Sequence, residues 1–307
     1  MTTEAAQGAT GAFGGVTPSA LLDGAVRPWL AHYPPGVAWD AEIPAQPVWD
    51  LLEEATARFP DRPVIDFLGK RTTYGELGVL VARAAKGLQA LGAGPGTKVG
   101  LFLPNCPYSV IFYFATLKTG ATVVNYNPLY TGPEIAQQIE DSDTDIMVTL
   151  DLAALCDKVT AQMGRTRLSR VVICPMAAAL PFAKGLLFPV ARGKDLARVP
   201  RDGHYVAYRD LMANDGQMDP PGIDPHASLA VLQYTGGTTG VPKGAMLTHA
   251  NVFANAVQSS LWFGSAENGH ESIVGVLPLF HVFAMTVVMN WIIRVGAEMI
   301  LLPRFEL

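Results

Sequence analysis

The sequence predicts an α/β fold in which layered parallel or mixed sheets are covered by helices. Apolar runs of strand length, such as residues 99–103 and 146–150, alternate with helical patterns, and these runs are apolar throughout rather than at every second position. A strand that is apolar on both faces needs cover on both sides, as parallel sheets have. The 307 residues are 50% hydrophobic and only 16% charged, which is ample for such a core.

The individual elements follow from local patterns. A first helix is expected over 47–59, where apolar residues recur at helical spacing. Thr73 and Thr131 each stand three residues before a glutamate, which is the spacing of a capping box at the start of a helix. A buried helix is expected over 107–118. The expected strands, each a short apolar run, are 99–103, 121–124, 146–150, 171–174, 230–234 and 298–302.

One apolar stretch, residues 273–293, is long enough to cross a bilayer and lacks Asp, Glu, Lys and Arg. Pro278, His281 and Asn290 would be costly in lipid. The pattern also divides into a strand over 272–277, a Pro-Leu-Phe-His turn and a helix. We therefore predict buried core here, with an integral membrane protein as the alternative.

The domain organisation is expected to be a mobile tail over 1–20 and one partial large domain over 21–307, with an irregular insertion at about 175–227. Residues 165–201 hold eight basic residues against one acidic residue, around an apolar run. Basic residues beside exposed apolar ones bind anionic membrane surfaces, so a peripheral membrane contact is expected here, with a solvated loop as the alternative.

Charge and cysteine content limit the binding partners and the cellular compartment that we expect. The net charge of −5 gives no overall basic surface for nucleic acid. Cys106, Cys156 and Cys174 form neither a CxxC pair nor a zinc pattern, and the N-terminus lacks the basic and apolar regions of a signal peptide. We expect a cytoplasmic protein, peripheral at the inner face of the cytoplasmic membrane.

The densest chemical signal is the segment 234–244, Tyr-Thr-Gly-Gly-Thr-Thr-Gly-Val-Pro-Lys-Gly, which follows an expected strand. Its glycines allow close backbone approach to a ligand, and successive N–H groups can form an anion-binding nest. Threonine hydroxyls and the Lys243 ammonium suit phosphate. A Walker A loop is the most similar alternative motif. In that motif the lysine directly follows a glycine, whereas here Val241 and Pro242 separate Gly240 from Lys243. A plain glycine turn is the simpler alternative.

This segment resembles the signature of the AMP-forming adenylating enzymes, which include acyl-CoA synthetases, luciferases and peptide-synthetase adenylation domains. Four further segments are similar to motifs of that family and occur in the family's order: 73–77, 117–128, 246–251 and 277–281. Within the family, the chain most resembles bacterial long-chain fatty acid–CoA ligases. The resemblance lies in the sequence Gln-Tyr-Thr-Gly-Gly-Thr-Thr-Gly, in the N-terminal segment 27–33 and in the basic, apolar insertion at 180–201.

The resemblance implies that a fatty acid carboxylate attacks the α-phosphorus of ATP, giving acyl-AMP and pyrophosphate, and that the thiol of CoA then releases AMP. It implies Mg²⁺ as the metal, with Thr235 as its ligand, and Thr235, Lys243 and His281 as catalytic residues. The residues that it assigns to nucleotide binding are Tyr234, Thr235, Gly236, Gly237, Thr238, Thr239, Gly240 and Lys243.

Two histidines have alternative interpretations. His281 lies in the family's Pro-Leu-Phe-His motif, and the alternative is a satisfied core histidine. Residues 283–285 after it either line an acyl channel or pack in the core. His249 follows the loop, where Thr248 can cap the next helix, and is expected to be structural.

The family's Tyr-Gly-x-Thr-Glu motif, its ribose-binding Asp motif and its small C-terminal domain are absent from the 307 residues. We expect an N-terminal portion that does not complete acyl-CoA synthesis by itself. An aryl- or medium-chain acyl-CoA ligase and a truncated, non-catalytic nucleotide-binding module stay as alternatives, and a homodimer is an expected assembly.

Overall fold

The computed structural model describes residues 28–200, 202–236, 242–264 and 270–303. The chain divides into two compact units, Met1–Ala41 and Glu42–Leu307. The described part of the first unit is a short 3-10 helix, Pro28–His32, followed by turns. The larger unit begins at Glu42. The predicted bounds, a tail over 1–20 and a large domain from residue 21, stay a prediction, and residues 1–27 lie outside the described residues.

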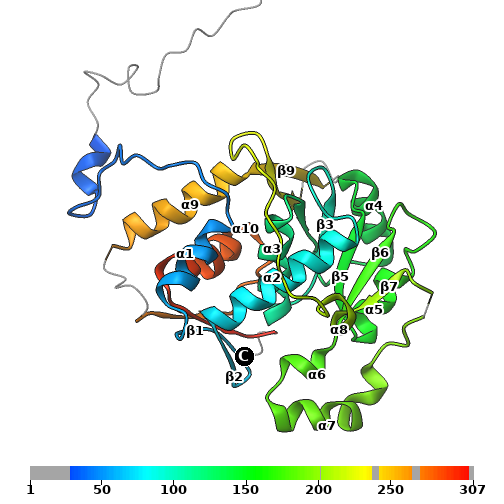
Figure 1. Cartoon of the computed structure of the whole chain (residues 1–307). Helices are drawn as coiled ribbons and strands as arrows, with labels where there is room; N and C mark the ends of the chain where they lie inside the picture. Colours follow the sequence, from blue (N-terminus) through cyan, green and yellow to red (C-terminus); the bar gives the residue numbers. More distant parts are fainter. Residues whose placement is uncertain (1–27, 201, 237–241, 265–269, 304–307) are drawn as a thin grey trace, which may run out of the picture. The chain divides into compact units, whose positions relative to one another are not determined.

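The main sheet of the larger unit has seven strands in the order β7-β6-β5-β3-β4-β8-β9 (Figure 1). All neighbouring pairs are parallel except β8 and β9, which form an antiparallel hairpin. The strand bounds are β3 Lys98–Phe102, β4 Thr122–Asn125, β5 Ile146–Leu150, β6 Arg170–Cys174, β7 Tyr205–Ala207, β8 Leu229–Thr235 and β9 Lys243–Thr248. The predicted mixed, largely parallel α/β architecture is confirmed.

A second sheet has four strands in the order β10-β11-β1-β2. Its bounds are β1 Pro63–Phe67, β2 Lys70–Thr73, β10 Ser272–Gly275 and β11 Glu298–Leu301. Strands far apart in the chain meet here, since β1 pairs with β11 in parallel and Ile65 lies opposite Met299. The sequence did not predict β1, β2, β7 or β9. Strands β2 and β9 carry polar residues and lack a continuous apolar run, β1 contains Asp66, and β7 has only three residues.

Helices begin where their capping residues predict. The Thr73 hydroxyl accepts from the Glu76 N–H at 3.2 Å, while the Thr73 N–H donates to the Glu76 carboxylate at 2.8 Å. The Thr131 N–H donates to Glu134 at 2.7 Å. The longer helices are α1 Asp50–Arg58, α2 Tyr74–Ala90, α3 Pro107–Lys118, α4 Gly132–Ser142, α5 Ala153–Thr160, α7 Phe182–Arg192 and α9 His249–Trp262.

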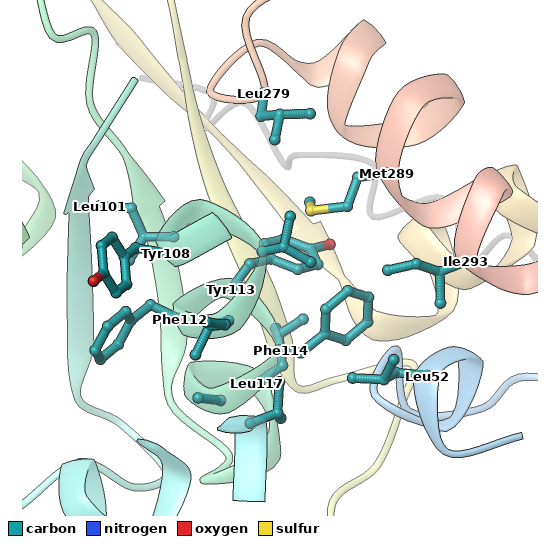
Figure 2. Packing of buried hydrophobic residues seen from close by; sticks show 14 of the residues in the cluster. Leu52, Leu101, Tyr108, Phe112, Tyr113, Phe114, Leu117, Leu279, Met289 and Ile293 are labelled. Carbon is teal, nitrogen blue, oxygen red and sulfur yellow. The ribbon is translucent and has the colours of Figure 1, made fainter. Parts of the chain in front are cut away.

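Helix α3 is the centre of the hydrophobic core. Its residues 108–117 are all buried, as expected of a helix that is apolar on every side. Figure 2 shows its aromatic side chains between strand β3, helix α1 and the segment that carries Leu279, Met289 and Ile293. The predicted buried core is confirmed only for the second half of the apolar stretch 273–293, since residues 284–286, 288–290, 292 and 293 are buried whereas 274, 276–278 and 281–283 are exposed. The stretch divides into β10, a turn, α10 Val282–Ala284, the π-helical segment Met285–Asn290 and α11 Trp291–Val295.

The membrane-spanning alternative for that stretch finds no support. Within the part of the chain that the structure describes, no helix has the length and apolarity needed to cross a membrane.

The segment 175–227 is more regular than expected. It contains α6 Met176–Ala179, α7, a 3-10 turn Gly193–Asp195, strand β7 and α8 Tyr208–Leu211, and β7 extends the main sheet by pairing with β6. These elements are mostly three to five residues long. Elements of this length are too short for hydrophobic periodicity to reveal, so the individual elements were not predicted, and the segment as an insertion stays a prediction.

Candidate functional site

The glycine- and threonine-rich segment is the turn of the β8–β9 hairpin at the edge of the main sheet. Thr235 pairs with Lys243, and the Thr235 hydroxyl donates to the Lys243 carbonyl at 3.5 Å. Directly paired residues of antiparallel strands place their side chains on the same face. The exposed Thr235 and Lys243 side chains therefore stand together at the mouth of the turn. Four predicted nucleotide-binding residues, Gly237, Thr238, Thr239 and Gly240, lie outside the described residues.

Tyr234 fixes the base of this hairpin. Its hydroxyl donates to the Asp141 carboxylate of helix α4, and its ring covers Gly244 on the paired strand. A Cβ on Gly244 would lie 3.1 Å from that ring, so a larger residue there would require the ring to shift by a few tenths of an ångström. Burial raises the pKa of the Tyr234 phenol, which consequently keeps its proton and remains a donor. In this structure Tyr234 is an anchor of the hairpin.

His281 ends a tight turn and begins helix α10. Its N–H donates to the Pro278 carbonyl at 2.9 Å, and its Nδ1 accepts from the Phe283 N–H at 3.5 Å. The imidazole is exposed, so the alternative of a satisfied core histidine is wrong. Phe283 is exposed as well, whereas Ala284 and Met285 are buried.

A chain of buried amides links the hairpin to this turn. The Gln233 side chain donates to the Phe280 carbonyl at 3.0 Å and accepts from Asn125 at 3.1 Å. Gln233 stands two residues before Thr235, and Phe280 stands one residue before His281. Strand β8, which leads into the predicted phosphate loop, is thereby held beside β4 and beside the turn that carries His281.

Asn105 holds the same turn from the carboxyl end of β3. Its amide donates to the carbonyls of Gly275 and Leu277 at 3.0 and 2.8 Å, and its side-chain oxygen accepts from the Leu279 N–H at 2.8 Å. We did not predict Asn105, Asn125 or Gln233 from the sequence. The available signal was a polar residue at or just beyond the end of an apolar strand, where ligands bind in open α/β sheets.

A cavity of about 560 Å³ lies next to this turn. Its walls are one side of α9, the segment 43–45 and the residues after His281, including Val282, Met285 and Thr286. The lining is mainly apolar, with the amides Asn251, Asn255 and Gln258 among the polar groups. Its size and composition suit a small organic ligand.

The described residues offer little to a metal ion. Among them no cluster of three or more His, Cys, Asp or Glu side chains could hold a metal. The Thr235 hydroxyl donates to its own hairpin. Mg²⁺ prefers several oxygen ligands, including substrate phosphates. Thr235 as a metal ligand stays a prediction.

His249 belongs to the scaffold beneath the site. It is the first residue of α9 and is fully buried, its ring meets that of Trp49 edge-on, and its Nδ1 accepts from the Val48 N–H at 3.1 Å. Thr248 caps the helix as predicted, since its hydroxyl accepts from the Asn251 N–H at 3.2 Å.

The amide chain predicts a measurable effect. Gln233→Met preserves shape but leaves the Phe280 carbonyl and the Asn125 amide without their partner, which should cost about 1–2 kcal/mol of unfolding free energy. Urea denaturation would measure this cost, and hydrogen exchange of residues 276–281 should accelerate selectively. Gln89→Met, at an exposed position on α2, is the matched control and should change neither. Unchanged exchange in the turn would contradict the proposed link.

A seven-stranded and a four-stranded sheet with their helices, and a glycine-rich segment between the paired strands β8 and β9, define an α/β domain. The family model "AMP-binding enzyme" matches residues 52–307. The chain belongs to this family of AMP-binding enzymes.

Individual proteins similar to this chain include long-chain-fatty-acid–CoA ligases. The chain is 38% identical over 284 residues to a long-chain-fatty-acid–CoA ligase of Bacillus subtilis, covering 91% of this chain and 50% of the relative. It is 35% identical over 282 residues to the ligase of the same name from Escherichia coli O157:H7, covering 89% and 50%. The crystal structure of a long-chain-fatty-acid-CoA ligase from Archaeoglobus fulgidus matches with a TM-score of 0.71 at 24% identity, again over 89% and 50%. The chain thus spans about half the length of these relatives.

Proposed function

We propose that this chain is the nucleotide-loop portion of an enzyme that activates a long-chain fatty acid with ATP and transfers the acyl group to CoA. The observation that carries the proposal is the β8–β9 hairpin, whose glycine-rich turn is flanked by Thr235 and Lys243 and held beside the His281 turn. Membership of the AMP-binding family and the names of the relatives support the choice of reaction.

The first step joins two anions. A carboxylate oxygen forms a bond to the α-phosphorus of ATP while the bond from that phosphorus to the bridging oxygen breaks, and pyrophosphate leaves with the electron pair. The protein must hold the reactants in line and neutralise the charge that grows on the leaving group. We assign this task to the Lys243 ammonium, with the hydroxyls of Thr238 and Thr239 as further donors. Mg²⁺ would add positive charge at the phosphates when bound.

We assign the acyl chain to the cavity beside the turn. Met285 and Val282 line it directly after His281, so a carboxylate near His281 would have an apolar space within reach. Phe283, which is exposed and does not line this cavity, is a second candidate wall. CoA as the acyl acceptor and a homodimer are part of the same proposal, as is a peripheral contact of segment 165–201 with the inner face of the cytoplasmic membrane.

ATP–pyrophosphate exchange with acids of graded length tests the proposed activity. The protein encoded by the reading frame that carries these 307 residues should show exchange with palmitate well above exchange with butyrate or 4-coumarate. The 307-residue chain alone should not complete acyl-CoA synthesis. Exchange with aryl acids only would favour the aryl ligase alternative, and no exchange with any acid would favour a non-catalytic nucleotide-binding module.

A further inference from the structure

Helix α7 carries an apolar face that points to solvent. Phe182, Leu186 and Val190 follow one another at four-residue intervals with 86%, 68% and 86% of their surface exposed, and Leu187 beside them is 63% exposed. At 100° per residue these four side chains span roughly 140° of the helix circumference. Every residue of α7 is exposed or half-buried. The exposed apolar positions are thus gathered on one side rather than scattered.

The opposite side of α7 fixes this orientation. Gly185 packs so closely on α6 that a Cβ would lie 2.4 Å from the Ala177 carbonyl, and Phe188 packs against the main core. The Lys184 ammonium donates to the Leu68 carbonyl at 3.2 Å, which ties the helix to the β1–β2 hairpin. The protein therefore holds α7 with its apolar side outward.

The tip of the β1–β2 hairpin adds to this face. Leu68 is 37% exposed and has φ of +55°, a left-handed conformation that glycine or asparagine adopts more easily than leucine. A Cβ on Gly69 would lie 3.9 Å from Pro181, so the tip lies against the start of α7. The Lys70 ammonium donates to the Ala178 carbonyl at 2.6 Å. An apolar side chain is thus retained at a strained, exposed turn beside the apolar helix.

Basic residues surround this surface, although not all those of segment 165–201 contribute. Three arginines lie at the amino end of β6, whereas α7 follows its carboxyl end: Arg165, Arg167 and Arg170. Of these, Arg167 pairs with Asp143 and Asp145. The exposed cations that accompany the apolar residues are Lys70, Lys184, Arg192 and Lys194, of which Arg192 pairs with Asp195.

We propose that α7 and the β1–β2 tip form a docking surface for an anionic phospholipid bilayer. We call it the α7 face and define it by Leu68, Phe182, Leu186, Leu187 and Val190 with the cations Lys70, Lys184, Arg192 and Lys194. The whole chain carries a net charge of −5 and would be repelled by anionic lipid unless its cations gather at one place, as they do here. Apolar side chains enter the interface while the lysines and arginines meet the headgroups. This deepens the membrane contact of the proposed function by naming its residues, and it holds whether or not the chain takes part in acyl activation.

Co-sedimentation of the 307-residue chain with large vesicles tests the docking surface. We expect binding to vesicles of phosphatidylcholine mixed with phosphatidylglycerol, weaker binding to phosphatidylcholine alone, and loss of the difference at high salt. The double variant L186S/V190S should bind at least about tenfold more weakly, because two apolar anchors are lost. Its melting temperature should not change, because both side chains are exposed in the folded chain. L129S, at another exposed leucine, is the matched control.

Two further variants separate docking from folding. Leu68→Asn suits the left-handed turn better, so it should weaken vesicle binding severalfold while the melting temperature stays equal or rises. Lys184→Glu should reduce binding to anionic vesicles more than Arg165→Glu, which changes the same charge outside the α7 face. Equal binding of wild type and L186S/V190S would overturn the proposal. So would a wild-type dimer in light scattering that this variant converts to monomers, because the α7 face would then be a protein interface.

Discussion

Replacing Lys243 by methionine is expected to lower the rate of fatty-acid-dependent ATP–pyrophosphate exchange by about a hundredfold, the usual loss when one group that stabilises developing charge is removed. Lys243 is the first residue of β9 and pairs with Thr235 across the hairpin. Its side chain is exposed, so methionine should not disturb the fold. The measurement is the exchange rate as a function of ATP concentration in the protein encoded by the whole reading frame.

Two companion variants make this result specific. Lys243→Arg keeps the charge but changes its shape and should retain more activity than Lys243→Met. Lys86→Met, which removes an ammonium paired with Asp215 on the surface, should leave exchange unchanged. Wild-type exchange in Lys243→Met would remove Lys243 from the proposed phosphate site without affecting the membership of the chain in its family.

Local signals predicted much of the fold because their causes are local. The capping boxes at Thr73 and Thr131 need only a hydroxyl, a backbone N–H and a glutamate three residues away, and their backbone hydrogen bonds are present. Strands such as β5 were predicted to the residue because burial on both faces makes every position apolar. Strand β2, with the sequence Lys-Arg-Thr-Thr, has neither signal, since its only reason to be extended is pairing with β1.

The candidate site could be predicted only where chemistry is concentrated in one segment. The turn between Thr235 and Lys243 is dense enough in glycine, threonine and lysine to stand out. Asn105 and Gln233 act through partners more than forty residues away, so no window of sequence contains both ends of their hydrogen bonds. The basic segment 165–201 illustrates a different limit of sequence reasoning. Sequence proximity grouped arginines that the fold places at the two ends of β6.

His249 should make the folded chain lose stability as the pH falls from about 6.5 to about 4. Burial lowers its pKa from 6.5 to about 4 in the folded chain. Since Nδ1 accepts from the Val48 N–H, the ring is neutral with its proton on Nε2, and a second proton would place two donors face to face at a helix N-terminus. Between these pH values the unfolded chain binds a proton that the folded chain does not. The contribution of His249 to the free energy of unfolding therefore falls by about 3 kcal/mol across this range.

The difference between wild type and His249→Asn isolates this contribution. Asparagine can still accept from Val48 but does not titrate, so the pH dependence between 6.5 and 4 should flatten even though some packing on Trp49 is lost. Asp50, whose pKa burial raises from 3.8 to about 6, binds its proton in the folded chain first and so favours folding as the pH falls. Because Asp50 is present in both proteins, its effect cancels in the comparison. Urea denaturation at several pH values supplies the data, with the exposed His270→Asn as control. Parallel curves for wild type and His249→Asn would show that His249 is protonated as easily in the folded chain as in the unfolded one.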